Sequence, residues 1–163
     1  MDRAAHQDIN VHEGLKSTLT MLAAKLRGLE VVKDFDRTLP DVPAYPGELN
    51  QVWTNLIDNA VAAMRGPDGT GTGTLTVRTA LDGECVLVEI GDTGPGIPPE
   101  LTTKIFEPFF TTKPVGEGTG LGLDISYRIV VQRHGGDLRV VSTPGDTRFQ
   151  VLLPLREPPA ATA

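Results

Sequence analysis

The chain has 163 residues, 39% of them hydrophobic and 22% charged, so it is long enough for one domain with a hydrophobic core. Its net charge of −6 argues against a general nucleic-acid-binding protein. Its apolar runs are too short to cross a bilayer, and no signal-peptide pattern follows the first residues. The single Cys85 cannot form an intramolecular disulfide, which fits a reducing, cytoplasmic location. We therefore expect a cytoplasmic domain without nucleic-acid or membrane contacts.

The N-terminal segment is predicted to contain one helix and one strand. Residues 1–9 are expected to form a frayed extension. A helix is predicted to begin near Asn10, with Glu13 three residues later as in a capping box. The apolar positions of this helix recur at helical spacing up to Gly28, and they are Leu15, Leu19, Leu22 and Leu26. Residues 30–35 are typical of a short strand.

The clearest predicted element is a helix that follows a proline-containing loop. Pro40 and Pro43 mark this loop, and Pro46 suits the first turn of a helix. One apolar face then repeats at helical spacing, through Val52, Trp53, Leu56, Ile57, Ala60, Val61 and Met64. Residues 66–69, Gly-Pro-Asp-Gly, end the helix.

Two hairpins are predicted in the C-terminal half. Residues 75–80 and 85–90 flank an Asp-Gly pair that favours a tight turn. Residues 138–142 and 148–153 flank a second turn with the sequence Pro-Gly-Asp. Both pairs carry the β-branched and apolar residues that strands favour.

The remaining segments connect these hairpins. Residues 98–106 are predicted to form a short helix, and residues 107–119 a loop. Residues 121–134 alternate as a strand would, but their length and glycine-rich entry favour a helix. Residues 157–163 are rich in Pro and Ala and are expected to be disordered. Residues 10–156 thus form the single predicted domain.

Asn55 and Asn59 lie four residues apart on the clearest helix, so they project from neighbouring positions beside its apolar face. An amide in that place can offer a carbonyl oxygen to a cleft. Mg²⁺ prefers oxygen ligands and keeps several waters when it bridges phosphates. The alternative is that both are surface asparagines on a polar helix flank.

Asp92 ends a predicted strand and enters a glycine turn. A carboxylate fixed there can accept a hydrogen bond from an exocyclic amine such as that of adenine. Gly94 and Gly96 let the backbone approach a flat base closely and permit a positive φ. An ordinary Asp-x-Gly turn is the alternative, although the prolines at 95, 98 and 99 stiffen this loop as a binding site requires.

A second glycine block occupies residues 116–122 at the entry of a predicted helix. Glycine N–H groups and a helix N-terminus together form a cradle for anions. The block is neither a Walker A sequence nor a dinucleotide-binding fingerprint. Lys113 precedes it and could reach a phosphate as a point charge. A flexible hinge is the alternative, and it is compatible with a loop that closes over phosphates.

Taken in order, these motifs resemble those of the catalytic ATP-binding domain of bacterial sensor histidine kinases, in the GHKL superfamily. The resemblance covers roughly residues 10–155. The matching segments are residues 55–60 with the N box, 92–97 with the first glycine box, 106–113 with the F box, 118–123 with the second glycine box, and 142–154 with the closing hairpin.

The resemblance implies an α/β fold, a two-layer sandwich in which a mixed β-sheet packs on three helices, as in the GHKL or Bergerat-type ATP-binding fold. ATP and Mg²⁺ are the implied cofactors. By family pattern Asp92 would hold the adenine amine, Asn59 the Mg²⁺, and Asn55 would support the phosphate side. The implied catalytic residues are Asn55, Asn59 and Lys113. The implied nucleotide-binding residues are Asn55, Asp92, Gly94, Gly96, Ile97, Phe106, Thr112, Gly118, Thr119, Gly120, Leu121 and Gly122.

One departure from the family concerns phosphate charge. Many of these kinases place Lys, His or Arg shortly after the second asparagine of the N box, whereas Val61 and two alanines follow here. The phosphate charge must then be met by the metal, by the loop amides, and by Lys113 or Arg128.

The phosphoacceptor of the family is not found in this sequence. These kinases phosphorylate a His on a separate helical dimerisation domain, and His12-Glu13 is followed by one helix and then a strand. We therefore expect His12 and His134 to be structural. The expected partners are the dimerisation and phosphoacceptor domain and, through that domain, a response regulator. The isolated chain is expected to be a monomer.

Two other functions stay open. One is a GHKL ATPase of the gyrase, mismatch-repair or chaperone type, in which a glutamate one helical turn before the metal-binding asparagine activates water. Asn55 occupies that position here and has no basic carboxylate. The other is a module that senses adenine nucleotides without catalysis, because intact glycine boxes indicate binding and do not prove turnover.

Overall fold

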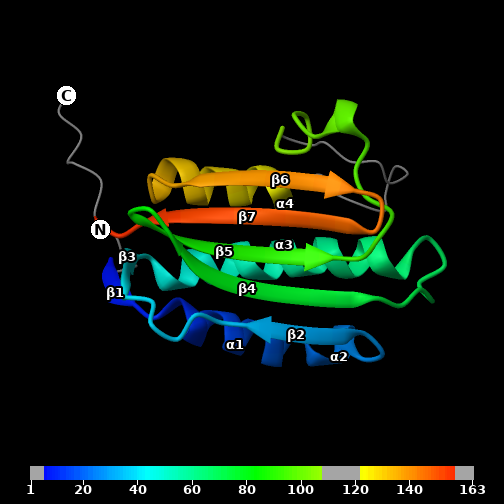
Figure 1. Ribbon diagram of the computed structural model, residues 1–163, viewed down its shortest axis with the longest axis horizontal. Coiled ribbons are helices and arrows are strands. Elements are labelled where there is room, and N and C mark those ends of the chain that lie inside the picture. The colour runs from blue at the N-terminus through cyan, green and yellow to red at the C-terminus, as the bar shows by residue number, and fades with distance from the viewer. Residues whose placement is uncertain (1–5, 108–121, 157–163) are drawn as a thin grey trace.

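The computed structural model describes residues 6–107 and 122–156, which form two layers (Figure 1). One layer is a five-stranded sheet with the order β2-β4-β5-β7-β6. β2 runs parallel to β4, and the other neighbouring pairs are antiparallel. The strands are β2 (Glu30–Asp34), β4 (Thr74–Asp82), β5 (Cys85–Asp92), β6 (Asp137–Thr143) and β7 (Asp146–Pro154). The sheet is mixed, as the predicted α/β sandwich requires.

Helices form the other layer and cover one face of the sheet (Figure 1). They are α1 (Val11–Met21), α2 (Ala23–Leu26), α3 (Pro46–Arg65), α4 (Gly122–Tyr127) and the π-helix η2 (Arg128–Arg133). A short 3-10 turn, η1 (Pro99–Leu101), follows β5. The helical layer on a mixed sheet confirms the fold class that the sequence predicted.

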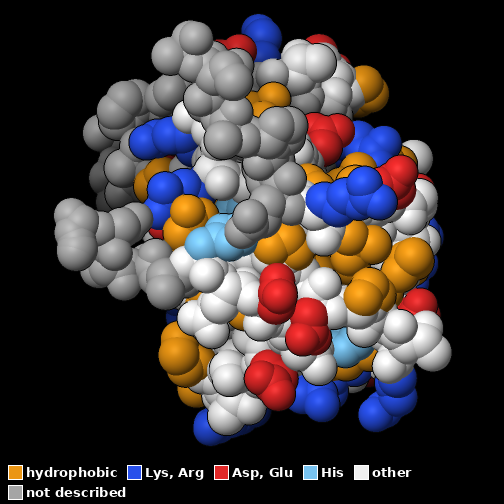
Figure 2. Space-filling model, turned by 90° about the vertical axis from the view of Figure 1, so that its left-hand side faces the viewer, with side chains coloured by type: hydrophobic (Ala, Val, Ile, Leu, Met, Phe, Trp, Pro, Cys, Tyr) orange, Lys and Arg blue, Asp and Glu red, His pale blue; other side chains and the backbone are white. Residues whose placement is uncertain are grey.

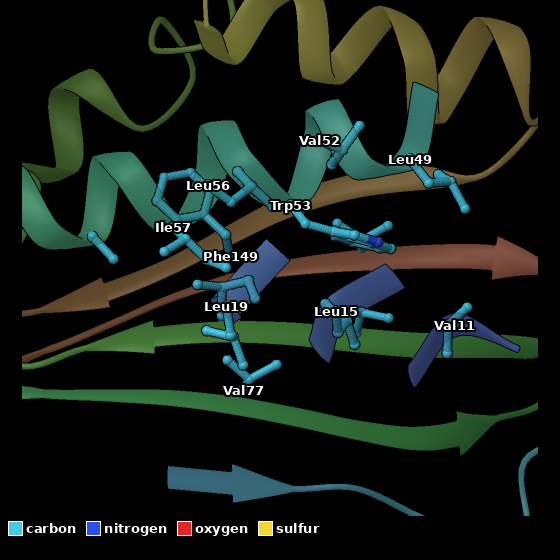
Figure 3. Close-up of a cluster of buried hydrophobic side chains, with 14 of the residues drawn as sticks. Val11, Leu15, Leu19, Leu49, Val52, Trp53, Leu56, Ile57, Val77 and Phe149 are labelled. Carbon is cyan, nitrogen blue, oxygen red and sulfur yellow. The ribbon is translucent and has the colours of Figure 1, made fainter. Parts of the chain in front are cut away.

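The core lies where α1 and α3 meet the sheet. Figure 3 shows Leu15 and Leu19 of α1, Trp53 and Leu56 of α3, and Val77 of β4 pointing into one cluster. The apolar face predicted for α3 is buried throughout, with Leu49 as an additional member. Full burial of an aliphatic or aromatic side chain contributes roughly 1.5–3 kcal/mol, so this face anchors α3 firmly on the sheet.

The boundaries of α3 follow local rules. Pro46 occupies the first turn, where its missing N–H removes no helical hydrogen bond. Gly66 caps the other end with φ +74°, a conformation that favours glycine. The first helix also begins as predicted, because the Asn10 side chain accepts a hydrogen bond from the His12 N–H. It breaks at Leu22, whose ψ of 10° separates α1 from α2.

A small second sheet was not expected from the sequence. Its strands are β1 (Gln7–Ile9) and β3 (Val42–Ala44), which pair antiparallel. Residues 7–9 were predicted to be frayed and residues 42–44 to be loop. These strands are only three residues long and form because Val42 and Ala44 are fully buried, which local patterning does not reveal. Figure 2 views this end of the molecule, where acidic, basic and hydrophobic side chains are interspersed.

Two further segments differ from the prediction. Residues 98–106 form the η1 turn followed by turns rather than a regular short helix. Residues 122–133 are helical as predicted, but their second half is a π-helix. The His134 N–H and Nδ1 both lie within hydrogen-bond distance of the Ile129 carbonyl oxygen, at 3.1 and 2.9 Å. This five-residue spacing is the hydrogen-bond pattern of a π-helix.

Candidate functional site

Asp92 is the last residue of β5, and its side chain is 5% exposed. Its Oδ1 accepts a hydrogen bond from the Gly94 N–H at 2.9 Å. Burial raises the pKa of the Asp92 carboxyl, the Gly94 hydrogen bond lowers it in part, and the nearby charge of Asp146 raises it further. Within the described residues nothing donates to the second oxygen, Oδ2. That oxygen is therefore available to accept a hydrogen bond from a ligand.

The glycine turn after Asp92 is held between α3 and the β6–β7 hairpin. A Cβ on Gly94 would lie 3.1 Å from the backbone of Ala63 in α3. Gly96 has φ +94°, and a Cβ there would lie 3.0 Å from the carbonyl oxygen of Thr143. The Gly94 carbonyl oxygen accepts from the Gly145 N–H at 2.9 Å. These three restraints from α3 and the hairpin are more than an isolated Asp-x-Gly turn requires.

Ile97 ends this turn and is also held by the hairpin. Its N–H donates to Ser142 Oγ at 2.8 Å, and Ser142 Oγ lies 2.7 Å from Thr147 Oγ1. The side chain of Ile97 packs against the hydrophobic core. The first glycine box therefore has a fixed backbone before any ligand binds, which lowers the entropic cost of binding.

Asn55 and Asn59 are half-buried on the side of α3 that faces α4. Asn55 Nδ2 donates to the Gly122 carbonyl oxygen at 3.1 Å and to Ser126 Oγ at 3.2 Å. The Asn59 amide has no hydrogen-bond partner among residues 6–107 and 122–156. The intervening Asp58 points elsewhere and pairs with Lys25 at 3.1 Å.

These contacts place the candidate site along one side of α3. Asn55, Asn59 and Ala63 are spaced four residues apart and so lie along one line of the helix. Asn55 contacts Gly122 at one end of this line, and Ala63 adjoins Gly94 at the other. At 1.5 Å per residue the line is about 12 Å long. The unpartnered Asn59 amide lies midway, between the glycine turn after Asp92 and the first turn of α4.

Phe106 connects the segment after the first glycine box to α4 and to the sheet. Its ring centroid lies 5.5 Å from that of Tyr127 and 6.3 Å from that of Phe149. Phe106 is half-buried, and it packs against the core. The remaining predicted site residues lie outside the described residues, and they are Thr112, Lys113, Gly118, Thr119, Gly120 and Leu121.

Arg128, considered above as a phosphate partner, is paired within its own helical segment. Its Nη2 lies 3.2 Å from Oδ2 of Asp124, and the Asp124 side chain is 5% exposed. Asp124 Oδ1 is buried and has no hydrogen-bond partner among the described residues. The four-residue spacing of the two charges is a signal that sequence analysis could have used.

Sequence reasoning also missed Ser126 and Ser142, which support the motif residues Asn55 and Ile97. Ser126 lies outside the matched segments, Ser142 only opens the closing-hairpin segment, and their partners lie 71 and 45 residues away in the chain. No local signal in the sequence points to these contacts. They become visible only when the elements are packed together.

Two of the histidines have structural contacts, as predicted. His12 stacks on Phe35 with ring centroids 4.6 Å apart, and its Nε2 lies 2.8 Å from Thr79 Oγ1. His134 Nε2 accepts from the Tyr45 N–H at 3.0 Å. Burial lowers the pKa of both imidazoles. In the part of the chain that the structure describes, no three His, Cys, Asp or Glu side chains group as metal ligands.

The fold and the site define a class of ATP-binding domain, and comparison with known proteins agrees. Residues 44–157 match the family model described as histidine kinase-, DNA gyrase B- and HSP90-like ATPase. Since this match covers more than half of the chain, the chain belongs to that family of ATP-binding domains. Within the family it is of the histidine kinase type, as the following relatives show.

The curated relatives are sensor kinases. The chain is 35% identical over 161 residues to the sensory histidine kinase/phosphatase NtrB of Salmonella typhimurium, covering 93% of this chain and 45% of NtrB. It is 43% identical over 154 residues to the sensor kinase CckA of Brucella abortus, covering 83% of this chain and 16% of CckA. The chain therefore spans less than half the length of these relatives.

Solved structures give the same assignment. The catalytic domain of histidine kinase ThkA has a TM-score of 0.82 and 30% identity, covering 93% of this chain and 96% of that domain. Full-length ShkA in complex with AMPPNP has a TM-score of 0.80 and 26% identity, covering 99% of this chain and 33% of ShkA. The chain is thus a histidine kinase catalytic domain. None of its described helices is both long and apolar enough to cross a membrane.

Proposed function

We propose that this domain binds Mg-ATP along the Asn55–Asn59–Ala63 line of α3 and donates the γ-phosphoryl group to a His on a separate dimerisation domain. The observation that carries the proposal is the arrangement on α3. A buried carboxylate lies beyond one end of this line, the start of α4 at the other, and an unpartnered amide in between. That order matches a base, a metal and a phosphate chain laid end to end.

At the adenine end, Asp92 has the chemistry of an amine acceptor. Oδ1 is already used by the Gly94 N–H, so Oδ2 would accept from the exocyclic amine. Gly94 and Gly96 keep side chains away from this position, and Ile97 adds apolar surface. The site thus fits a ring that presents an exocyclic amine donor, as adenine does.

At the phosphate end, the residues present fit a magnesium ion. Mg²⁺ takes oxygen ligands and keeps waters, and the half-buried Asn59 amide has no competing partner in the described chain. Asn59 would hold the ion, which when bound neutralises charge on the phosphates. Gly122 starts the helix next to Asn55. By the family's pattern Gly118, Thr119, Gly120 and Leu121 would cover the phosphates, with Thr112 and Lys113 near them.

The environments of two of the three histidines support transfer to another domain. His12 and His134 are buried and hydrogen-bonded, so neither is placed to receive a phosphoryl group. Phosphoryl transfer depends mainly on positioning and charge stabilisation, and this domain supplies the nucleotide half of that arrangement. One ThkA structure is described as a complex with response regulator protein TrrA. We infer that a response regulator is the later partner here, through the dimerisation domain.

Calorimetric titration tests the nucleotide site. The wild-type chain should bind ATP more tightly with Mg²⁺ than in EDTA, and Asn59→Ala should remove that gain. Asn50→Ala is the matched control, because Asn50 is also an α3 amide but faces α1, over Gly14. A folded wild-type chain that binds neither ATP nor ADP at millimolar concentration would refute the proposal.

Radiolabelled ATP tests the transfer. The chain alone should neither label itself on His nor release phosphate quickly. Added dimerisation domain with its His should become labelled slowly, since the tether that raises effective concentration is absent. Rapid phosphate release that Asn59→Ala abolishes would instead favour the hydrolase reading. Nucleotide binding without any transfer would favour a sensing module.

A further inference from the structure

The amide of Asn55 has only one orientation that its neighbours allow. Its Nδ2 lies 3.1 Å from the Gly122 carbonyl oxygen, which can only accept a hydrogen bond. An amide turned over would bring two acceptor oxygens together at that distance. Both Nδ2 hydrogens are therefore used within the protein, one on Gly122 and one on Ser126 Oγ.

Asn55 Oδ1 consequently points away from these partners, and no described group donates to it. An amide oxygen accepts hydrogen bonds or ligates cations, and it cannot bond to a phosphate oxygen, which is also an acceptor. Asn55 Oδ1 therefore does not bind a phosphate directly, and the metal ion or its bound waters can connect the two. Its oxygen shares this side of α3 with Asn59, one helical turn away.

Of the two groups that accept hydrogen bonds from the Asn55 amide, the Ser126 hydroxyl is the one that a substitution can remove. Ser126 is 0% exposed in the second turn of α4, where alanine would be the better helix former. Its hydroxyl provides the acceptor for the second Nδ2 hydrogen. Without that hydroxyl, the half-buried N–H loses its partner, which costs about 1 kcal/mol, and the amide gains rotational freedom.

We propose that Ser126 is a positioning residue, which fixes the Asn55 amide so that Oδ1 faces the metal side of the bound nucleotide. The inference rests on the proposed function, because it assigns Ser126 a place in the Mg-ATP site. Ser126 itself touches neither nucleotide nor metal. It acts through Asn55 and joins α4 to the helix that carries both asparagines.

The first experiment compares wild type with Ser126→Ala by calorimetry, with ATP in EDTA and with Mg-ATP. The variant should bind ATP in EDTA within about twofold of wild type. Its gain in affinity from Mg²⁺ should be about fivefold smaller, which is the equivalent of one hydrogen bond. Ser126→Cys, whose sulfur is a weak acceptor, should recover part of the gain.

Thr18→Val provides a matched control. Thr18 is 2% exposed in α1, and its hydroxyl donates to the Gly14 carbonyl oxygen of its own helix. The substitution removes one buried helical hydroxyl from α1, which carries none of the proposed site residues, and keeps the side-chain shape. It should lower stability without changing the magnesium gain. Circular dichroism checks that every variant is folded.

A second readout needs no nucleotide. In ¹⁵N-resolved NMR spectra, the Asn55 side-chain amide of wild type should give two protons that exchange slowly. In Ser126→Ala one of them should shift and exchange faster, whereas Thr18→Val should leave both unchanged. An Asn55 amide that does not respond to Ser126→Ala would show that the hydroxyl does not hold it.

The outcomes separate this inference from the proposed function. A wild type with no affinity for ATP would refute both. A wild type with a magnesium gain that Ser126→Ala keeps in full would overturn only the role of Ser126. An equal loss of affinity with and without Mg²⁺ would overturn it too, because a general disturbance of the site, rather than the orientation of one amide, would then explain the effect.

Discussion

The Gly94 N–H donates to Oδ1 of Asp92 at 2.9 Å, so one oxygen of this buried carboxylate shapes the turn while the other is left for a ligand. Burial keeps the pKa of Asp92 above its ordinary value, and the Gly94 hydrogen bond limits that rise. Oδ1 therefore holds the turn and Oδ2 is available to a ligand, and a substitution can change Oδ2 while an oxygen remains in the place of Oδ1.

We predict that Asp92→Asn leaves the fold intact and weakens adenine-nucleotide binding. The amide oxygen can still accept from Gly94, but an NH₂ group then replaces Oδ2 and meets the adenine amine as a second donor. Affinity should fall at least tenfold, about 1.4 kcal/mol. Calorimetry with ATP measures it.

Asp36→Asn is the matched control for this prediction. Asp36 also holds a turn through Oδ1, which accepts from the Thr38 N–H at 3.0 Å. Asp36 lies near Thr79, away from the Asp92 end of the sheet. This variant should bind ATP as wild type does. If Asp92→Asn also kept full affinity, Asp92 would be a turn residue only.

The second prediction concerns the close approach at Gly96. Gly96→Ala should destabilise the protein more than Gly83→Ala, although both glycines have positive φ, +94° and +61°. Gly83 has open space where a Cβ would be, so alanine there costs about 1–2 kcal/mol of backbone strain. At Gly96 the added contact with Thr143 should cost at least about 1 kcal/mol more. Urea unfolding of both variants measures the difference. Equal losses of stability in the two variants would show that the β6–β7 hairpin can shift to accommodate the added methyl group.

The elements that carry the motifs could be predicted because their signals are local. The apolar face of α3 repeats every three or four residues, and this placed Asn55 and Asn59 correctly beside the buried face. The Asp-Gly turn fixed the β4–β5 hairpin, and so it placed Asp92 at a strand end. Local spacing therefore gave the elements that carry the motifs, whereas the fold class was implied by the resemblance of those motifs to sensor histidine kinases.

The parts that could not be predicted depend on contacts between distant segments. The β1–β3 pair forms because Val42 and Ala44 are buried by the rest of the chain, not because of any alternation. The π-helix ends at His134, whose ring contacts the Ile129 carbonyl oxygen and the Tyr45 N–H. Ser126 could not be assigned a role until α4 was packed against α3. Such tertiary contacts override local propensity.

The third prediction is that stability falls on mild acidification, in part through His134. Its Nε2 accepts from the Tyr45 N–H, so protonation there breaks a buried hydrogen bond. Burial lowers the pKa of His134 in the folded protein. Its contribution is therefore complete above the unfolded-state pKa of about 6.5 and is lost as the pH falls toward the lower folded-state pKa.

His134→Gln tests this contribution. The variant should lose about 1–3 kcal/mol at pH 7.5, because buried backbone groups are left without a partner. It should also lose less stability than wild type between pH 7.5 and pH 5. The remaining slope would belong largely to His12, whose pKa burial also lowers. Denaturant unfolding at several pH values measures both effects, and a slope equal to that of wild type would contradict the assignment to His134.

The last prediction compares two carboxylates that share one arginine. Glu89 lies 3.9 Å from Arg148 and is 4% exposed, whereas Asp146 lies 2.9 Å from the same guanidinium on the surface. Glu89 also accepts from Arg78 at 3.1 Å and from Gln150 at 2.7 Å. Burial determines the strength of such pairs more than distance does, since water screens exposed charges. The buried Glu89 should therefore contribute more to stability than Asp146, although its contact with Arg148 is longer.

Glu89→Gln should cost about 1–3 kcal/mol of unfolding free energy, and Asp146→Asn less than about 1 kcal/mol. Burial alone would raise the pKa of Glu89, but the hydrogen bonds from Arg78 and Gln150 and the charges of Arg78 and Arg148 outweigh it, so the pKa lies below its ordinary value. The stabilisation from Glu89 is thus present above its unfolded-state pKa and is lost as the pH falls through the lower folded-state pKa. Urea titrations at pH 7 and at pH 3 should show the loss at pH 7, with the Glu89→Gln and wild-type stabilities converging in acid. A larger effect of Asp146→Asn would mean that proximity outweighs burial in this cluster.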